Sequence, residues 1–261
     1  MNNFFGMLAR MKYINRWGLM RNTKTENIAE HSLEVAIIAH ALAVIGNTYF
    51  GKELDAEHIA MLGIMHDTTE IITGDLPTPI KYYAPEIRDA YKKVENVAAC
   101  QLISELPEEM QNEYEDILLI ENDDINWKYV KAADKMSAYI KCIEERNTGN
   151  TDFAKAEERA ILSLDLKGTV IATGGSVVYS DKAMQHLKSL GKIIYLHLSY
   201  DDMCKRISNL ETRGIMLQGG ETLEDMYKER LPLYNKWAQA VINCGQNTVE
   251  QTARAIVRAS K

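Results

Sequence analysis

Four residues in the first half of this 261-residue chain carry side chains that bind metal ions: His31, His66, Asp67 and Asp134. They fall in three stretches with helical apolar periodicity, and His66 and Asp67 are adjacent. Two imidazoles and two carboxylates form a mixed nitrogen and oxygen set that suits Mn, Fe, Co, Ni or Zn better than calcium. The pattern predicts a site for one divalent transition metal, with positions left for water and a phosphate oxygen.

Each of these residues also has a purely structural explanation when it is taken alone. A histidine on an apolar helix face is commonly a satisfied core residue, and a helical aspartate is commonly solvated. Asp134 is harder to explain in this way, because Val130 and Ala133 place it on the buried stripe of its helix. An unpaired buried carboxylate is very costly, so Asp134 needs a cation beside it.

Other polar residues in this half could handle a phosphate ester. Glu70 follows His66 by four residues, so a continuous helix would place it on the same face, as a general acid or base. Arg16 and Trp17 combine a guanidinium with an indole, which suits a phosphate next to a flat base or a sugar. Taken alone, Trp17 would be a core residue, Glu70 a solvated carboxylate and Asp75 a turn former.

The first half must position these residues on helices. Apolar residues recur at helical spacing in four stretches, at residues 27–46, 55–73, 86–106 and 126–145. The first stretch has Asn27 as an N-cap and Glu30 as its capping-box partner, and Gly46 follows its apolar run. We expect an all-α first half.

The pattern changes after the polar stretch at residues 146–151. Short β-branched runs at 168–175 and 192–199 predict strands, and a helical pattern at 180–191 lies between them. Helical patterns follow at 200–210 and 226–240, and a short strand at 240–244 precedes a last helix from Thr248. This order is typical of an α/β segment with parallel strands.

Composition excludes several classes of function. The net charge of −7 and the pI near 5.5 argue against a nucleic acid polymer or an anionic membrane as partner. The four cysteines form no CxxC pair, which suits a reducing cytoplasm. We find no apolar stretch that approaches the ~18 residues of a membrane span, and basic residues interrupt the N-terminal segment where a signal peptide needs its apolar core. A cytoplasmic protein is expected.

Three segments of the first half carry a family resemblance: NRWGLMRNTKTENIAEHSLEVA, IMHDTTEIITGDLPTPIKY and VKAADKMSAYIKCIEE. They closely resemble the bacterial HD-domain 5′-deoxynucleotidases, and the similarity runs from Phe4 to about Asn150. The spaced pattern of His, His-Asp and Asp defines the HD superfamily, while NRW, HDxxE and GDLPTP narrow it to this branch.

The resemblance implies a metal-dependent hydrolase that removes the 5′-phosphate of deoxyribonucleoside 5′-monophosphates, usually as a homodimer. The two histidines and two aspartates would bind one divalent metal, and Glu70 would serve the chemistry. Arg16 would hold the 5′-phosphate, Trp17 would crowd the position of a ribonucleotide 2′-hydroxyl, and Asp75 would hydrogen-bond the sugar 3′-hydroxyl.

The second half resembles the C-terminal part of shikimate kinase from about Leu166 to Ser260, through TVIATGGSVVYS, IIYLHLSYDDMCKRI, TRGIML and ERLPLYNKWA. Gly174 and Gly175 match that family's glycine-rich turn, Arg230 its substrate-carboxylate arginine and Arg213 its lid arginine. The sequence contains no GxxxxGK[ST] string, so we expect no phosphoryl transfer, and the two arginines are predicted to be vestigial.

In the kinase family, the P-loop strand separates the strands that match residues 168–175 and 192–199. Its loss predicts that the remaining strands are paired anew, exchanged between protomers or only marginally stable. We expect three regions: an HD-domain nucleotidase at 1–152, a junction helix at 153–165 and a truncated kinase-like segment at 166–261. The predicted fold is an all-α helical bundle followed by a partial three-layer α/β segment with a short parallel sheet.

Two alternatives remain open at the level of sequence. The chain could be another HD-domain phosphohydrolase that acts on a nucleoside triphosphate or a cyclic dinucleotide. It could also be a non-catalytic binding protein that holds an aromatic-pathway ligand through Arg230 of the kinase-like half.

Overall fold

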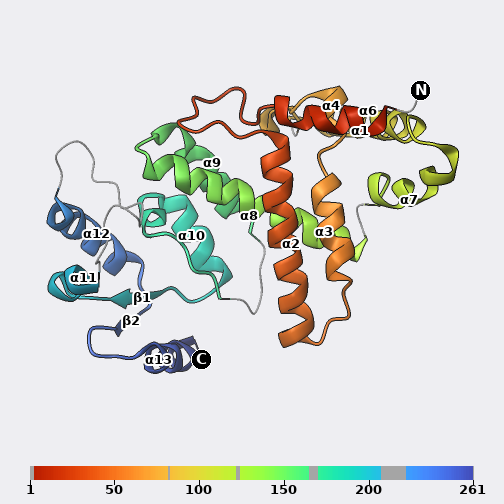
Figure 1. The fold of residues 1–261 in the computed structure, drawn as a ribbon. Helices are drawn as coiled ribbons and strands as arrows, with labels where there is room; N and C mark the ends of the chain where they lie inside the picture. The colour runs from red at the N-terminus through yellow and green to blue at the C-terminus, as the bar shows by residue number, and fades with distance from the viewer. Residues whose placement is uncertain (1–2, 82, 122–123, 165–169, 207–221, 261) are drawn as a thin grey trace. The chain divides into compact units, whose positions relative to one another are not determined.

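A computed structural model describes residues 3–81, 83–121, 124–164, 170–206 and 222–260. The chain divides into two compact units, Met1–Lys141 and Cys142–Lys261. The first unit is helical and the second contains the only two strands of the described residues (Figure 1). The expected order, a helical part followed by an α/β part with a short parallel sheet, is confirmed.

The first unit consists of helices, which run in chain order as α1 Phe4–Leu8, η1 Ala9–Tyr13, α2 Ile28–Phe50, α3 Ala56–Met65, α4 Glu70–Thr73, α5 Thr78–Lys81, α6 Pro85–Ser104, α7 Glu108–Leu118 and α8 Ile125–Asn147. Helix α8 continues past the boundary into the second unit. The apolar pattern predicted α2, α6 and α8, but α1, η1 and α7 are short and were not predicted.

Helix α2 begins as predicted and ends later than predicted. The side chain of Asn27 accepts hydrogen bonds from the backbone of Ala29 and Glu30, and Glu30 completes the capping box. The expected end at Gly46 is wrong, because this glycine is buried inside the helix, where a Cβ would lie 3.3 Å from side-chain atoms of neighbouring residues. The helix ends at Gly51, whose φ of 60° is the left-handed conformation that glycine adopts easily.

Helix α2 is also long and apolar enough to cross a membrane, judged by length and composition alone. The expectation that no stretch approaches that length is therefore wrong. An apolar core helix passes the same test, and the buried side of α2 fits that explanation. Val35, Ala39 and Ala43 form a buried cluster with residues of α3 and α8.

The predicted helix at residues 55–73 is interrupted. Helix α3 ends at Met65, turns follow, and α4 starts at Glu70. The hydroxyl of Thr68 donates to the carbonyl of Met65 at 2.8 Å, which offers the backbone an alternative to a continuous helix. The prediction that Glu70 shares a helix face with His66 is therefore wrong, although the short turn keeps both residues in one region.

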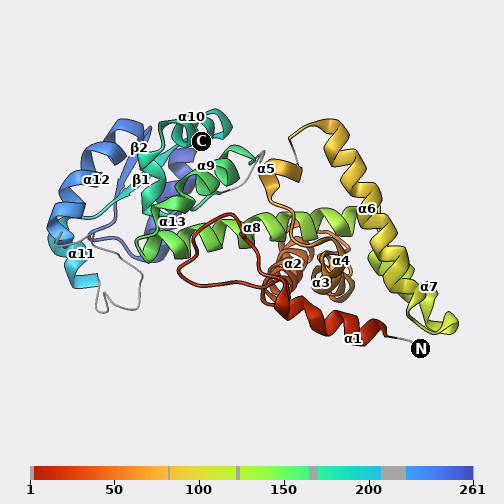
Figure 2. The same ribbon diagram turned by 90° about the horizontal axis from the view of Figure 1, so that it is seen from above.

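Helices α2 and α3 lie side by side with α8 against them (Figure 2). Ile59 and Leu62 of α3 and Val130 and Ala133 of α8 complete the cluster around α2, and all four side chains are fully buried. The close approach of α2 and α3 depends on Gly63, since a Cβ there would lie 2.7 Å from the Cα of Ala36. This cluster holds the helices that carry the predicted metal ligands.

The second unit contains η2 Thr151–Phe153, α9 Ala154–Leu162, η3 Gly175–Tyr179, α10 Asp181–Leu190, β1 Ile194–His197, α11 Tyr200–Arg206, α12 Leu223–Trp237, β2 Ala240–Asn243 and α13 Val249–Ser260. The strands β1 and β2 pair in parallel, with Ile194 opposite Ala240 and His197 opposite Asn243. The predicted strands at 192–199 and 240–244 are thus confirmed.

The third predicted strand of this unit is wrong in the part that the structure describes. Residues 170–174 have no strand conformation, and Val170 is 86% exposed. A strand needs a hydrogen-bonding neighbour, and the resemblance places the missing P-loop strand between this segment and β1. The sheet retains β1 and β2, which are direct neighbours, and the β-branched run beside the gap has no partner strand among the described residues.

Candidate functional site

Three helical segments bring the four predicted metal ligands together. His31 lies in α2, His66 and Asp67 follow α3, and Asp134 lies in α8. One ligand atom from each of His31, His66 and Asp134 lies within 4.8 Å of the other two. The Nε2 atom of His31 lies 3.2 Å from Oδ1 of Asp134 and 3.6 Å from Oδ2 of Asp67. The same oxygen of Asp67 lies 3.1 Å from Nε2 of His66.

The chemistry of this cluster fits a bound cation. Both Nε2 atoms are buried, and neither has a hydrogen-bond partner in the part of the chain that the structure describes. Nδ1 of His66 lies 2.8 Å from the carbonyl of Gly63, which can only accept, so Nδ1 carries a proton and in the neutral ring Nε2 presents a lone pair. A cation bound there would be coordinated by these lone pairs and would neutralise the carboxylates. Histidines that bind metals commonly donate a hydrogen bond from their second ring nitrogen, as Nδ1 of His66 does here.

The charges in the cluster support one another. Burial disfavours the charged form of Asp67, but the adjacent His66 lowers the pKa of its carboxyl well below the usual range. Burial likewise opposes the charge of Asp134, and His31, His66 and Lys131 lower its pKa. Burial opposes the charge of His66, yet Asp67 raises its pKa. Two carboxylates, only partly exposed at 18% and 29%, therefore remain ionised close to each other, which attracts positive charge.

Glu70 lies beside these carboxylates and is 8% exposed. Burial, Asp67 and Asp75 raise the pKa of Glu70 to about 9. Its Oε2 atom is buried and has no hydrogen-bond partner among the described residues. A buried, unsatisfied carboxyl near ionised carboxylates is typical of a functional site, because structure alone gives no reason to keep it there.

Arg16 and Trp17 are held together by Glu26. A single oxygen of Glu26 accepts from Nη1 of Arg16 at 2.7 Å and from the indole nitrogen of Trp17 at 3.1 Å. Burial opposes the charge of Arg16, but Glu26, Asp67 and Asp134 together raise its pKa. Its cation is thus held within the field of the carboxylates of the metal cluster, where it can meet an anionic substrate group.

Trp17 also anchors Asp75 and has a strained backbone. Its backbone nitrogen donates to Oδ2 of Asp75 at 3.1 Å. Its φ of 61° lies in the left-handed region, which a bulky side chain rarely adopts. Such strain persists where the surroundings enforce it, and it is common at ligand sites. Burial raises the pKa of Asp75, which is consistent with a partly enclosed position.

Sequence reasoning missed three residues that support this site. Glu26 fixes Arg16 and Trp17, and its only sequence signal is its place next to the cap of α2. Ser137 lies 3.0 Å from Nδ1 of His31 and donates to Glu34 at 2.6 Å. Both have helical spacings that could have indicated them, since Glu34 follows His31 by three residues and Ser137 follows Asp134 by three.

The kinase-like residues lie in the second unit. Nε of Arg230 donates to the hydroxyl of Tyr179 at 3.2 Å, and its guanidinium lies 5.5 Å from that ring's centroid. The hydroxyl of Tyr234 donates to the carbonyl of Gly175 at 3.0 Å. Gly174 is the N-cap of η3. Arg213 lies outside the described residues.

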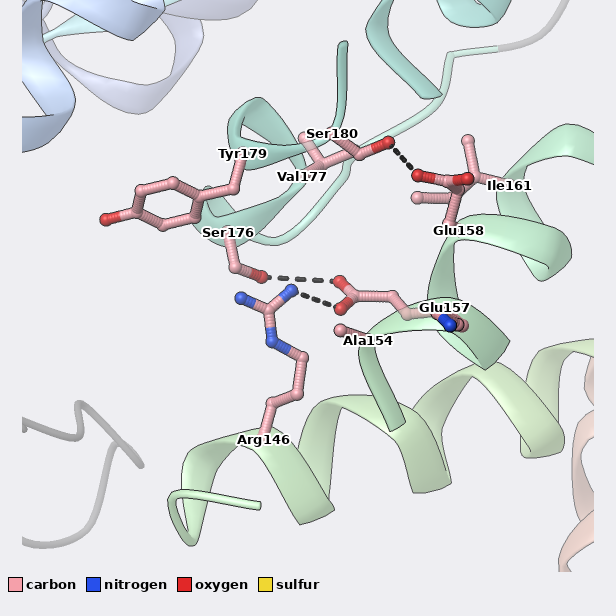
Figure 3. A pocket seen from close by; sticks show the side chains of 10 residues that line it. Arg146, Ala154, Glu157, Glu158, Ile161, Ser176, Val177, Tyr179 and Ser180 are labelled. Carbon is pink, nitrogen blue, oxygen red and sulfur yellow. Dashed lines mark hydrogen bonds and ion pairs between the residues drawn. The ribbon is translucent and has the colours of Figure 1, made fainter. Parts of the chain in front are cut away.

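A cavity of about 200 Å³ also lies in the second unit, between the end of α8, α9 and η3 (Figure 3). Three of its charged side chains, Arg146, Glu157 and Glu158, already have hydrogen-bond partners in its lining. Glu157, which is 2% exposed, accepts from Arg146 and from Ser176, and Glu158 accepts from Ser180. Because these side chains satisfy one another, the cavity resembles a packing defect around a buried ion pair more than a site with waiting ligands.

Comparison with known proteins finds two families, whose matched regions overlap at residues 132–169. Residues 3–169 match the family model described as 5′-deoxynucleotidase YfbR-like, and residues 132–261 match that of shikimate kinase. A 5′-deoxynucleotidase of Photobacterium profundum is 51% identical over 171 residues, which are 64% of this chain and 87% of that protein. One of Vibrio parahaemolyticus is 49% identical over 169 residues, with the same coverage.

The solved structures include a similar fold. An HD-domain phosphohydrolase from Listeria innocua covers 90% of this chain and 98% of its own, with a TM-score of 0.58 and 20% sequence identity. This likeness supports the fold of the chain. The resemblance that the motifs indicated in each half is confirmed by the two family models.

Proposed function

Since this chain belongs to the YfbR-like 5′-deoxynucleotidase family, we propose that it hydrolyses deoxyribonucleoside 5′-monophosphates to a deoxynucleoside and phosphate. The observation that carries the proposal is the convergence of His31, His66 and Asp134, whose ligand atoms lie within 4.8 Å of one another, with Asp67 beside them. A phosphate monoester is the substrate class that this site and the nearby Arg16 suit.

The metal ligands are assigned to His31, His66, Asp67 and Asp134, and the ion to a divalent transition metal among Mn, Co, Fe, Ni and Zn. A cation bound there supplies Lewis acidity toward a phosphate oxygen and an attacking water. The orphaned Nε2 atoms of both histidines and the ionised carboxylates support this assignment.

The chain's own residues bind and orient the substrate. Arg16, held by Glu26, would bind the 5′-phosphate. Asp75, which accepts from the backbone of Trp17, would accept a hydrogen bond from the sugar 3′-hydroxyl. The Trp17 side chain would fill the space next to C2′ and so select against a 2′-hydroxyl. Glu70 would move a proton to or from the reacting oxygens.

The remaining assignments concern the chain as a whole. We assign residues 1–152 to the nucleotidase, 153–165 to a junction helix and 166–261 to a truncated kinase-like segment. No disulfide joins the cysteines among the described residues, which suits a cytoplasmic location. A homodimer is proposed as the assembly. The exposed side of α2 supports a homodimer, because Leu33 and Ile37 there are 58% and 63% exposed. Analytical ultracentrifugation, which measures the mass of the assembly, tests this proposal.

The test is phosphate release from the deoxynucleoside monophosphates and their ribonucleotide counterparts. The protein is stripped with a chelator and resupplied with Mn, Co, Mg or Zn, and His66→Ala is measured beside it. The expected result is metal-restored release that favours deoxyribonucleotides and is lost in the variant. His40→Ala is the matched control, since His40 lies exposed on α2 and should leave release unchanged.

Two results would contradict the proposal. Release from a nucleoside triphosphate or a cyclic dinucleotide, but not from monophosphates, would assign the site to another HD-domain reaction. A folded, metal-loaded protein that releases phosphate from none of these substrates would leave the metal cluster without the proposed activity.

A further inference from the structure

A chain of two hydrogen bonds links His31, one of the proposed metal ligands, through Ser137 to Glu34. Nδ1 of His31, in α2, lies 3.0 Å from the hydroxyl of Ser137, in α8. The same hydroxyl donates to Oε2 of Glu34, one turn after His31, at 2.6 Å. His31 and Ser137 are completely buried, so the bond between them is shielded from solvent, and Glu34 is partly buried. The proposed hydrolysis uses neither Ser137 nor Glu34.

These contacts determine which nitrogen of His31 carries a proton. Ser137 has one hydroxyl proton, and the charge-assisted bond to Glu34 uses it. The oxygen of Ser137 must then accept from Nδ1 of His31, which places a proton on Nδ1. In a neutral imidazole Nε2 is therefore the lone-pair nitrogen, and it faces Asp134 at 3.2 Å.

We propose that Glu34 and Ser137 are positioning residues, which hold the proton of His31 on Nδ1 and so keep Nε2 available for a cation. This inference rests on the proposed metal site. It concerns the orientation and tautomer of one ligand and makes no use of the substrate. It also explains why a serine occupies a fully buried position on α8, at helical spacing from the buried Val130 and Ala133.

The arrangement also selects between two sets of ligands. His31 belongs to a second group of potential ligands as well, with Glu26 and Glu34, whose ligand atoms also lie within 4.8 Å of one another. Because Nδ1 is bonded to Ser137, only Nε2 is open to an ion, and Nε2 faces Asp67 and Asp134. Ser137 thereby directs the ion to the cluster that contains His66.

The test uses zinc alone and requires no substrate. Long-range ¹H–¹⁵N correlation spectra of the zinc-loaded protein should show a metal-bound Nε2 and a protonated Nδ1 for His31. Competition with a chromophoric chelator should give zinc binding roughly 10–100-fold weaker for Ser137→Ala, the usual effect of losing a group that orients a ligand. Ser137→Thr retains the hydroxyl and should restore the affinity.

Two further variants make the test specific. Glu34→Gln retains an acceptor but loses the charge, so it should weaken zinc binding less than Ser137→Ala does. Ser104→Ala removes an exposed helical serine of α6 and should have no effect. Thermal unfolding of each variant shows whether it is folded. Weaker zinc binding by a folded variant can then be assigned to the lost orientation of His31.

The proposal is overturned if zinc binds Nδ1 of His31, or if folded Ser137→Ala binds zinc as tightly as the parent with unchanged ¹⁵N shifts. Both readouts are independent of nucleotide hydrolysis. A protein that binds zinc as expected but hydrolyses no nucleotide would refute the proposed function and leave this inference intact.

Discussion

The two units differ in how closely their structures agree with what their sequences predict. In the first unit, residues from three distant helical segments converge, so that Nε2 of His31 lies 3.2 Å from Asp134 and Nε2 of His66 lies 3.1 Å from Asp67. In the second unit, the segment that leads to Gly174 and Gly175 has no strand conformation over residues 170–174. Both units resemble known families, but among the described residues only those of the first unit bring predicted site residues together in a cluster of buried atoms without hydrogen-bond partners.

The difference follows from how helices and parallel strands are stabilised. A helix satisfies its backbone hydrogen bonds within its own residues, so α2 and α8 need no partner segment for their backbone and their side chains meet through packing. A parallel strand depends on a neighbour that lies far away in the sequence. The run at residues 170–174 has no partner strand among the described residues and is not a strand, while the described helices of the first unit need no such partner.

The largest effect is expected for a variant of the first unit, which tests whether activity depends on that unit alone. Glu70→Ala should reduce turnover roughly 10²–10⁴-fold, the usual contribution of a positioned acid or base, and should leave metal binding intact because Glu70 is not assigned as a ligand. Steady-state phosphate release and the metal content of the purified protein measure the two effects.

Arg230→Ala is the matched comparison in the second unit. Arg230 donates to Tyr179, and nothing in the proposed hydrolysis requires it. Turnover should remain within about twofold of the parent. A loss in Arg230→Ala similar to the loss in Glu70→Ala would mean that the kinase-like unit takes part in the reaction.

Sequence reasoning was most accurate where local rules decide the structure. The capping box of Asn27 and Glu30 and the buried stripe of α8 follow from residue types at fixed spacing, and both are observed. It was less accurate at the end of α3, where the Thr68 hydroxyl bonds to Met65 and the helix stops before Glu70. The apolar periodicity continues through that turn and gives no sign of the break.

The support of the site was harder to predict than its ligands. Glu26 and Ser137 act through distances that only the packing of helices sets, and serine or glutamate at such positions is common on any helix. The strand prediction for residues 170–174 was wrong for a related reason. Their β-branched side chains indicate a preference for strand, but they do not show whether a neighbouring strand is present to pair with. Contacts between distant segments are what one sequence conveys least.

The second prediction compares two buried glutamates, one in each unit. The pKa of Glu70 is raised to about 9, so the folded protein keeps a proton that the unfolded chain loses above about pH 4.3. Folding stability should therefore fall as the pH rises from about 5 to about 8. Glu70→Gln cannot titrate, so the metal-free variant should lose less stability over this range, by up to roughly 4 kcal/mol.

Glu157→Gln, in the second unit, should change folding stability in the opposite direction to Glu70→Gln. Glu157 is 2% exposed and accepts from both Arg146 and Ser176, so its charge is compensated. Removing that charge leaves Arg146 without its ion pair and should destabilise the protein. Denaturant unfolding of the metal-free parent and both variants at several pH values measures this. A parallel pH slope in Glu70→Gln and the parent would show that Glu70 is ionised in the folded state.

The smallest expected effect concerns how tightly each unit is packed at a glycine. A Cβ on Gly63 would lie 2.7 Å from the Cα of Ala36, which is backbone of α2 and cannot turn away. A Cβ on Gly175 would also lie 2.7 Å from another atom, but that atom is the hydroxyl of Tyr234, at the end of a side chain that can move.

We expect Gly63→Ala to destabilise the protein by about 1 kcal/mol or more, because the added methyl group pushes α2 and α3 apart. The same displacement separates His31 from His66 and should therefore weaken zinc binding. Gly175→Ala should change both quantities much less, and Gly18→Ala, where the new methyl group meets open space, is the control for both. Thermal unfolding and chelator competition on the three variants decide the matter. Equal effects of Gly63→Ala and Gly175→Ala would contradict the view that the metal cluster depends on the close contact of two helices while the kinase-like unit tolerates rearrangement.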